Sequence, residues 1–366
     1  MILKKNAGQS PKRFLIINPF GIGDILFTTP LIKALKEEYP DCFIGYWCNR
    51  RVRPLLEANP RVNQLFDLSR GDLKKIYRDS FFNGLRETLK LRRDIKKGNF
   101  NICFDFSLDY RYSLFAKIIG IPRRIGFNYK NRGRFLTDKI DITGYHDKHA
   151  VEHYLDLLRF LNIEAKDKSL ELCVPEPAGI EARNILGSRG IQANDLLVGI
   201  APGAGGSWGK DAAYKHWPAL KFAQVADKLA NEFKAKIIIL GDETEKPISE
   251  TIINAMLHKP VDLTGKIKLE LLPAVMQNLN LLISNDGGPM HIASALGVKS
   301  VSIFGPVSEL VYGPYPDTRN HPVLKWDMEC RPCYKNFRLP VCGKDRECLR
   351  AVNVEDVFTA AKALLS

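Results

Sequence analysis

Asp24 stands in the stretch GIGDILFTTPLIKAL (residues 21–35), directly after the apolar run FLIIN at residues 14–18. A strand, a glycine turn and a helix open many nucleotide sites, but a negative charge in the turn disfavours a bound phosphate. One interpretation is that the carboxylate stabilises the helix N-terminus, where the helix dipole favours an acid. The other is that Asp24 acts as a general base and accepts the proton of an acceptor hydroxyl.

Two later loops combine glycines with side chains that could bind an anion. In IAPGAGGSWGKDAAYKHWP (residues 200–218), small residues let backbone amides approach a ligand, and Lys215 supplies a point charge suited to a diphosphate. In SNDGGPMHIASALG (residues 284–297), an apolar strand is followed by Asp286, a two-glycine turn and His291. Helix N-termini bind phosphates through their free amides. The loops predict an anion site, although Lys215 could be solvated and His291 could be a packed core residue.

Several nucleotide-site and metal-site motifs are absent. A G-x-G-x-x-G fingerprint would need a third glycine where the chain has Leu26, and a Walker A loop would need a glycine at Ala204 and a hydroxyl residue at Asp211. The chain contains neither an Asp-x-Asp pair nor an H-E-x-x-H motif. These absences argue against kinases, P-loop ATPases and metal-dependent hydrolases.

The composition is that of a globular protein with a strong positive charge. Of 366 residues, 45% are apolar and 26% charged, and no apolar run approaches the roughly 20 residues that span a bilayer. Because no secretory signal is visible either, we expect a cytoplasmic protein. The net charge of +13 is concentrated at residues 72–97, with nine basic and four acidic side chains, and at 121–139, with six and one. These segments are either solvated faces or a surface for a polyanion such as nucleic acid, an acidic membrane or an anionic substrate.

Cysteines cluster near the C-terminus. Four of the eight fall in one segment, at Cys330, Cys333, Cys342 and Cys348. Their spacing begins like a zinc site, but no second C-x-x-C follows, so the alternatives are a bound zinc ion and a loop of reduced thiols. The remaining four lie in apolar runs and are predicted to fill the core: Cys42, Cys48, Cys103 and Cys173.

Short apolar runs alternate with amphipathic stretches along the whole chain, which predicts an α/β fold with mainly parallel sheets. In the first half we expect strands at 14–18, 42–47, 64–68, 101–106 and 123–127, and helices at 24–38, 51–58, 72–97, 109–119 and 148–162. A linker is expected at 174–195. Beyond it we expect strands at 196–202, 236–241, 281–284 and 300–305, with a short one near 262, and helices from 217, before 258, at 270–279 and at 288–296. In such folds ligands bind at the carboxyl ends of the strands, where the three loops lie.

Together the three loops resemble one known family. GIGDILFTTPLIKALKEEYP, the PGA and KHWP elements, and SNDGGPMHIASALG followed by VSIFGP are similar to the lipopolysaccharide heptosyltransferases of glycosyltransferase family 9. The resemblance covers nearly the whole chain and implies a GT-B type fold, with two Rossmann-like domains facing across a cleft. It implies an acceptor-binding domain at 1–175, an ADP-sugar-binding domain at 176–350 that includes the cysteine-rich loop 330–348, and a C-terminal helix at 351–366.

The resemblance also implies roles for particular residues. Asp24 would be the catalytic base, Lys215 would contact the donor diphosphate, and Glu245 would lie near the donor nucleoside. The donor-binding set is Gly203, Ala204, Lys215, Glu245, Asp286, Gly287, Gly288, Met290 and His291. The acceptor-binding set is Gly21, Gly23, Arg123 and Arg124.

The implied activity is an inverting, metal-independent transfer of heptose from ADP-L-glycero-D-manno-heptose to the inner core of lipopolysaccharide, at Kdo or at the first heptose. No cofactor is required beyond the ADP-sugar donor. The expected partners are ADP-heptose, a lipid A-Kdo or heptosylated core acceptor, and the anionic inner-membrane surface, to which the protein would be peripheral. The alternatives are a family 9 transferase with another nucleotide sugar, a nucleotide-sugar epimerase or dehydrogenase, and a basic nucleic-acid-binding protein. Nucleic acid is not expected, because aromatic and basic residues do not interleave.

Overall fold

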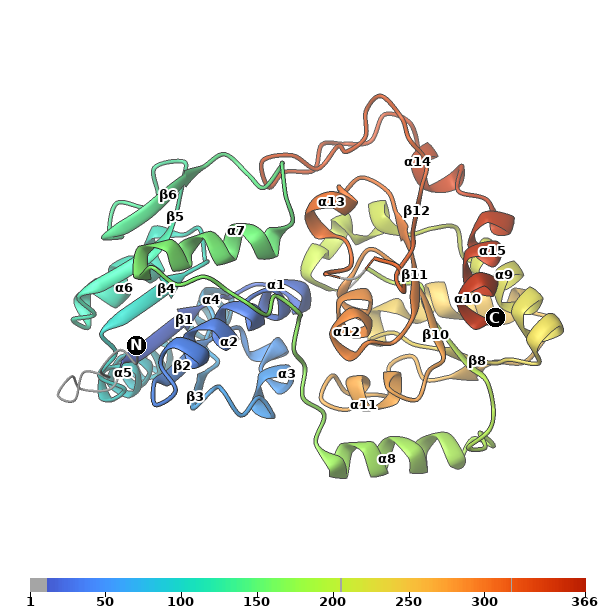
Figure 1. Ribbon diagram of the computed structural model, residues 1–366, viewed down its shortest axis with the longest axis horizontal. Coiled ribbons are helices and arrows are strands. Elements are labelled where there is room, and N and C mark those ends of the chain that lie inside the picture. Colours follow the sequence, from blue (N-terminus) through green and yellow to red (C-terminus); the bar gives the residue numbers. More distant parts are fainter. Residues whose placement is uncertain (1–11, 205, 317) are drawn as a thin grey trace, which may run out of the picture. The chain divides into compact units, whose positions relative to one another are not determined.

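The structure is a computed structural model that describes residues 12–204, 206–316 and 318–366. The chain forms two compact units (Figure 1). The first unit consists of the residues up to Phe20, Thr28–Thr143 and Tyr154–Lys168. The second consists of Gly21–Phe27, Gly144–His153 and Ser169–Ser366, so two short segments of the N-terminal half belong to it. This division differs from the predicted boundary between residues 175 and 176.

The first unit is built on a six-stranded parallel sheet in the order β3-β2-β1-β4-β5-β6. The strands are β1 (Arg13–Ile17), β2 (Phe43–Trp47), β3 (Gln64–Phe66), β4 (Ile102–Asp105), β5 (Arg123–Tyr129) and β6 (Asp138–Ile142). Its helices are α2 (Thr29–Glu38), α3 (Pro54–Glu57), α4 (Arg70–Asp79), α5 (Phe81–Lys97) and α6 (Tyr110–Ile118), with 3-10 turns η1 (Arg50–Val52) and η2 (Leu157–Leu161). The residues of α7 (Ala150–Asp156) are divided between the two units.

The second unit repeats this topology. Its parallel sheet has the order β12-β11-β10-β7-β8-β9. The strands are β7 (Leu197–Ala201), β8 (Lys236–Ile239), β9 (Val261–Asp262), β10 (Leu281–Asn285), β11 (Ser300–Phe304) and β12 (Val323–Lys325). The helices are α1 (Ile22–Phe27), α8 (Glu176–Gly187), α9 (Ala219–Phe233), α10 (Lys246–Ala255), α11 (Leu272–Met276), α12 (Gly288–Leu296), α13 (Glu309–Tyr312), α14 (Glu347–Arg350) and α15 (Val354–Leu365), with 3-10 turns η3 (Gly206–Lys215) and η4 (Glu243–Glu245).

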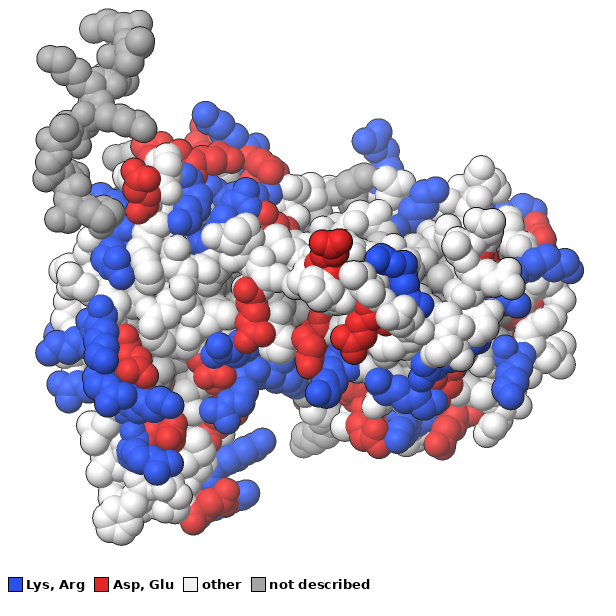
Figure 2. Space-filling view, turned by 90° about the horizontal axis from the view of Figure 1, so that it is seen from below, with Lys and Arg blue, Asp and Glu red and all other residues white. Residues whose placement is uncertain are grey.

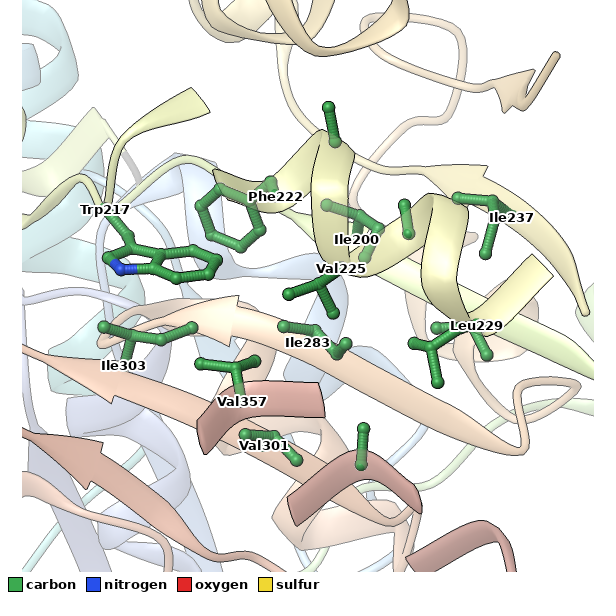
Figure 3. Close-up of a cluster of buried hydrophobic side chains, with 14 of the residues drawn as sticks. Ile200, Trp217, Phe222, Val225, Leu229, Ile237, Ile283, Val301, Ile303 and Val357 are labelled. Atoms are coloured by element: carbon green, nitrogen blue, oxygen red, sulfur yellow. The ribbon is translucent and has the colours of Figure 1, made fainter. Parts of the chain in front are cut away.

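Each unit has its own hydrophobic core. In the second unit, α9 turns Phe222, Val225 and Leu229 toward the sheet at helical spacing (Figure 3). Alternate strand residues such as Ile283 and Ile303 meet them. In the first unit the corresponding core joins strand residues to α5 and α6 and consists of Leu15, Ile17, Trp47, Phe66, Leu68, Leu91, Ile95, Phe100, Cys103, Tyr112, Ala116, Ile119 and Ile121. Each core therefore fixes the strand ends of its own unit.

The α/β fold with parallel sheets is confirmed, but several boundaries differ from the prediction. The helix predicted at 24–38 is two helices, because α2 begins anew with a proline in its first turn. The helix predicted at 72–97 is interrupted at Ser80, whose extended backbone ends α4 and whose side chain accepts a hydrogen bond from the Asn83 amide at the start of α5. The predicted linker contains α8, and β6, β12, α13 and α14 were not predicted.

Within the described residues, no helix is both long and apolar enough to cross a membrane. Cys42, Cys48 and Cys103 are buried as predicted, whereas Cys173 is only half-buried. Burial raises the pKa of the Cys48 thiol to about 12.

Candidate functional site

The candidate site lies in the second unit, where the strand order reverses between β7 and β10. Ligands in open parallel sheets bind at this point, beyond the carboxyl ends of the strands. The buried Asn285 ends β10 and ties the neighbouring loops together. Its side-chain nitrogen donates to the Pro202 carbonyl, and its side-chain oxygen accepts from the Trp217 amide at 3.0 Å. The loops after β7 and β10 are therefore held side by side.

Lys215 and Asp286 form a buried ion pair in this position. Lys215 Nζ lies 2.7 Å from Asp286 Oδ2, and the two side chains are 4% and 5% exposed. The ammonium group also lies 4.2 Å from the centre of the Trp208 ring, a cation–π contact. The backbone that carries Lys215 is fixed by the next residues, because Trp217 is fully buried and donates from its indole to the Val352 carbonyl. A cation is thus held at a defined point beside the loop after β10.

Glu245 lies against the loop after β7. A Cβ atom at Gly203 would overlap the Glu245 carboxylate, and one at Gly241 would lie 2.9 Å from Glu245 Oε2. The same oxygen accepts from the Asp242 amide at 2.9 Å, which fixes the carboxylate at the start of η4. The structure therefore brings together Glu245 and Gly203, two members of the predicted donor-binding set, and the absence of a side chain at 203 makes the approach possible. Their role toward a donor stays a prediction.

Helix α12 begins within this cluster. Gly287 precedes it in extended conformation, and Gly288 and a proline form its first turn. A Cβ at Gly287 would meet the Ala204 backbone at an ordinary distance of 3.4 Å, so these two loops are neighbours. The N-terminus of α12 therefore lies beside the loop after β7, and the free amides of a helix N-terminus suit an anion. Met290 is fully buried, so only its backbone is available to a ligand.

Helix α1, which carries Asp24, packs on α12 through two glycines. A Cβ at Gly288 would lie 2.7 Å from Ile22 Cδ1, and one at Gly23 would lie 2.6 Å from His291 Cδ2. The space beside Gly23 is thus occupied by the His291 ring. Gly23 was assigned to the acceptor-binding set, which stays a prediction, and in the structure its missing side chain makes room for another helix.

His291 belongs to a buried aromatic cluster. Its ring meets Phe27 edge-on, with centroids 4.8 Å apart, and Phe27 meets His149 in the same way at 5.0 Å. His149 Nδ1 accepts from the Val151 amide and Nε2 lies 3.0 Å from the Gly313 carbonyl, an arrangement that fits the neutral ring. Burial lowers the pKa of His291 to about 3 and that of His149 to about 4. Both rings are neutral at physiological pH, so neither can act as a general acid there.

Asp24 is half-buried at the start of α1, and its Oδ2 accepts from the Gly21 amide at 3.2 Å. Tyr312 lies in α13, and its ring meets the Tyr334 ring with centroids 6.0 Å apart. Burial raises the pKa of the Tyr312 phenol well above its usual range, and the charges of Tyr334, Tyr145, Asp24 and Asp286 raise it further. Asp24 directly follows Gly23, whose Cβ position meets the His291 ring, and lies two residues after Ile22, which meets Gly288. The carboxylate is therefore carried by a helix that packs beside the start of α12.

Arg123 and Arg124 do not belong to this cluster. They start β5, at the amino end of the first unit's sheet. Arg123 binds Asp138 through two hydrogen bonds of 3.1 Å, and Arg124 donates to the carbonyls of Phe135, Ile121 and Pro122. Both guanidinium groups therefore have contacts within the unit, and their role in acceptor binding stays a prediction.

The cysteine-rich segment carries no recognisable metal centre in the part of the chain that the structure describes. No group of three or more His, Cys, Asp or Glu residues there is arranged to hold a metal ion. Burial and the neighbouring Cys330 raise the pKa of the Cys333 thiol to about 11. The zinc site at these cysteines stays a prediction.

Sequence reasoning missed three aromatic members of the site. Trp208 was interpreted only as part of a glycine-rich loop, Tyr312 lies in a four-residue helix that was not predicted, and His149 was not singled out. Only Trp208 had a detectable signal, since a bulky aromatic residue among glycines is unusual for a mobile loop. The other two come from segments distant in the sequence, so no local pattern could join them to the site.

Comparisons with known proteins agree on one family. Residues 88–339 match the family described as glycosyltransferase family 9 (heptosyltransferase). Lipopolysaccharide heptosyltransferase 3 of Escherichia coli K12 is 23% identical over 94% of this chain and 95% of its own. Among solved structures, a family 9 glycosyl transferase of Veillonella parvula has a TM-score of 0.82 and 27% identity, covering 99% of both chains. Heptosyltransferase WaaC of E. coli, solved with ADP-2-deoxy-2-fluoro heptose, has a TM-score of 0.69 and 16% identity, covering 96% of this chain and 99% of its own.

Proposed function

Because the chain belongs to glycosyltransferase family 9, the heptosyltransferases, and has their GT-B type fold, we propose that it transfers a heptose from ADP-L-glycero-D-manno-heptose to the inner core of lipopolysaccharide. The transfer inverts the configuration at the anomeric carbon. One observation carries the proposal: the buried Lys215 ammonium lies beside the N-terminus of α12, at the switch point between β7 and β10. A cation and free helix amides converging on one point suit a diphosphate.

The donor is assigned to this side of the site. Lys215 and the first amides of α12 bind the diphosphate, and Glu245 beside Gly203 accepts hydrogen bonds from the nucleoside ribose. When the sugar leaves, negative charge develops on the diphosphate, and fixed donors stabilise that charge without reorganising. The structural relative WaaC was solved with an ADP-heptose analogue, which supports ADP-heptose as the donor.

Asp24 is assigned as the base. It removes the proton as an acceptor hydroxyl attacks the anomeric carbon, while the bond from that carbon to the diphosphate oxygen breaks on the opposite face. Its half-buried position on α1, which packs against α12, supports this role. The acceptor hydroxyl belongs to Kdo or to the first heptose, and the enzyme works at the cytoplasmic face of the inner membrane. A family 9 transferase with another nucleotide sugar is the second candidate.

The test is transfer by the Asp24→Asn variant. The wild type is incubated with ADP-heptose and Kdo-bearing lipid A, and the product is read by mass. We expect Asp24→Asn to lose more than about 100-fold in turnover, because it removes the base, while ADP affinity changes little. The matched control is Asp72→Asn, which changes a carboxylate in the first turn of α4. If both variants kept most of their activity, Asp24 would only stabilise its helix. Transfer from a different nucleotide sugar alone would keep the mechanism and replace the donor.

Metal independence has its own measurement. If Lys215 and the α12 amides supply the positive charge, transfer in excess EDTA should match transfer with added Mg²⁺. Loss of activity in EDTA that Mg²⁺ restores would assign the diphosphate to a metal ion.

A further inference from the structure

Helix α5, on the first unit (Figure 1), exposes apolar side chains to solvent. Phe81 is 65% exposed, Phe82 81%, Leu85 40% and Leu89 51%. These four residues, the apolar cluster, occupy the N-terminal half of the helix. Large apolar side chains exposed together on one element mark an interaction surface, whereas scattered ones do not.

The helix is fixed by a different face, so the apolar cluster cannot turn inward. Gly84, Leu91 and Ile95 are buried on that face. A Cβ at Gly84 would lie 2.5 Å from the Tyr77 ring, so the Tyr77 side chain of α4 packs directly on the backbone of α5. The Tyr77 hydroxyl, 3.0 Å from the Thr88 hydroxyl, links the two helices further along.

Basic side chains share the outer face with the apolar cluster. At 100° per residue, Arg92 projects between Phe81 and Leu85, and Lys96 projects between Leu85 and Leu89. The exposed basic residues of α5 are Arg86, Lys90, Arg92, Arg93, Lys96 and Lys97. The two acidic residues of α5 are neighbours of arginines, Glu87 at 3.5 Å from Arg86 and Asp94 at 3.3 Å from Arg93. Lys and Arg also gather along the left-hand edge of Figure 2, on the first unit.

We propose that the outer face of α5 docks on an anionic lipid bilayer. Aromatic and leucine side chains insert at the level of the headgroups, and long basic side chains extend to the lipid phosphates. A polyanion in solution would explain the basic residues but not the exposed phenylalanines, and a second protein copy would explain the phenylalanines but not the excess of positive charge. The inference rests on the proposed function in one respect: a lipid-linked acceptor gives the docking its purpose.

The experiment measures binding of the full chain to vesicles by sedimentation. Phosphatidylcholine vesicles with phosphatidylglycerol should bind the protein, and those without it should bind it weakly. Phe81→Ser/Phe82→Ser should weaken the partition coefficient by roughly tenfold or more, because the two rings no longer enter the interface. Arg92→Gln/Arg93→Gln should weaken it several-fold and reduce its salt dependence. The matched control, Leu257→Ser, changes an 86% exposed side chain on the second unit and should bind like the wild type.

Equal binding by the wild type and the Phe81→Ser/Phe82→Ser variant would overturn the proposal. A change in oligomeric state in that variant would also overturn it, because the apolar cluster would then belong to a contact with a second copy. Binding of the wild type to RNA that persists at physiological salt would overturn it as well. The single variant Phe82→Ser changes only the most exposed ring of the cluster, so it provides the same test if the double variant does not fold. Transfer to a delipidated core oligosaccharide, which needs no membrane, separates this proposal from the proposed function. The α5 variants that bind vesicles weakly should still transfer heptose to this soluble acceptor. Vesicle binding without any transfer would refute only the function.

Discussion

Lys215 and Asp286 are the residues on which the proposed donor site depends most. Each is almost fully buried, and each is charge-compensated by the other across 2.7 Å. Removing one partner of such a pair leaves an uncompensated buried charge, which costs more than the pair itself contributes. A loss of activity after mutation of either residue is therefore interpretable only together with stability.

We expect Lys215→Met to lower the free energy of unfolding by about 3 kcal/mol, since Asp286 is left buried without its cation. Lys215→Met/Asp286→Asn should recover much of this loss, because both charges are gone. Urea unfolding of the wild type, both single variants and the double variant completes the cycle. Both Lys215 variants should nevertheless bind ADP at least tenfold more weakly, because the diphosphate has lost its cation. ADP affinity restored in the double variant would show that Lys215 acts on Asp286 alone.

The two buried histidines predict acid sensitivity. The folded-state pKa values of His291, about 3, and of His149, about 4, lie below the ordinary value near 6.5. The unfolded chain therefore takes up protons first, so their stabilising effect is complete above about pH 6.5 and is lost as the pH falls. By pH 5, protonation of each histidine in the unfolded chain should lower the free energy of unfolding by about 2 kcal/mol. In urea unfolding at pH 7 and pH 5, His291→Leu should lose less stability than the wild type, and His146→Gln, on an exposed histidine, should lose as much. Equal losses in all three would mean that His291 takes up no proton on unfolding.

At the scale of elements, the contact between α1 and α12 positions Asp24, the proposed base. Two glycines, Gly23 and Gly288, let the helices approach until side chains of one meet the backbone of the other. Asp24 lies one residue after Gly23, so the separation of the helices sets the distance from the carboxylate to the donor loop. A change of a few tenths of an ångström in the separation of these helices should lower the rate of transfer.

Gly23→Ala tests this contact. The new methyl group would lie 2.6 Å from His291 Cδ2, so we expect a loss of about 1–3 kcal/mol in unfolding free energy and at least tenfold in transfer. The control is Gly179→Ala inside α8, where the nearest atom is 3.6 Å away; it should stabilise the fold by about 0.5–1 kcal/mol and keep full activity. If Gly23→Ala were as stable and active as the wild type, α1 would not depend on close packing for its position.

Elements with local signals were predictable from the sequence, and those fixed by distant contacts were not. The strands β7 and β10 and the helix α12 carry continuous apolar runs or glycine signals, and all were predicted within a residue or two. By contrast, β12 is three half-exposed residues that pair with β11, and nothing local distinguishes it from a loop. The same holds for the site: glycine loops predicted Lys215 and Asp286, but only the fold brings Tyr312 to them.

At the scale of the whole molecule, two sheets of the same strand order divide the chain into units with separate cores. The residues assigned to the donor belong to the second unit. The basic, aromatic-bearing helix α5 belongs to the first. Domains with their own cores can unfold separately, so a ligand that binds one of them stabilises that one.

This division predicts where ADP acts. At 100 times its Kd, ADP should raise the unfolding free energy of the unit that binds it by about 2.7 kcal/mol. Amide hydrogen exchange should slow at residues 201–204 and 285–291 and around Lys215, and should remain unchanged in β5 and β6. Asp24→Asn should show the same protection, because the base does not bind the diphosphate, whereas Lys215→Met should show little. Protection at the carboxyl ends of β1 and β4 would assign the nucleotide to the first unit and reverse the donor and acceptor assignments.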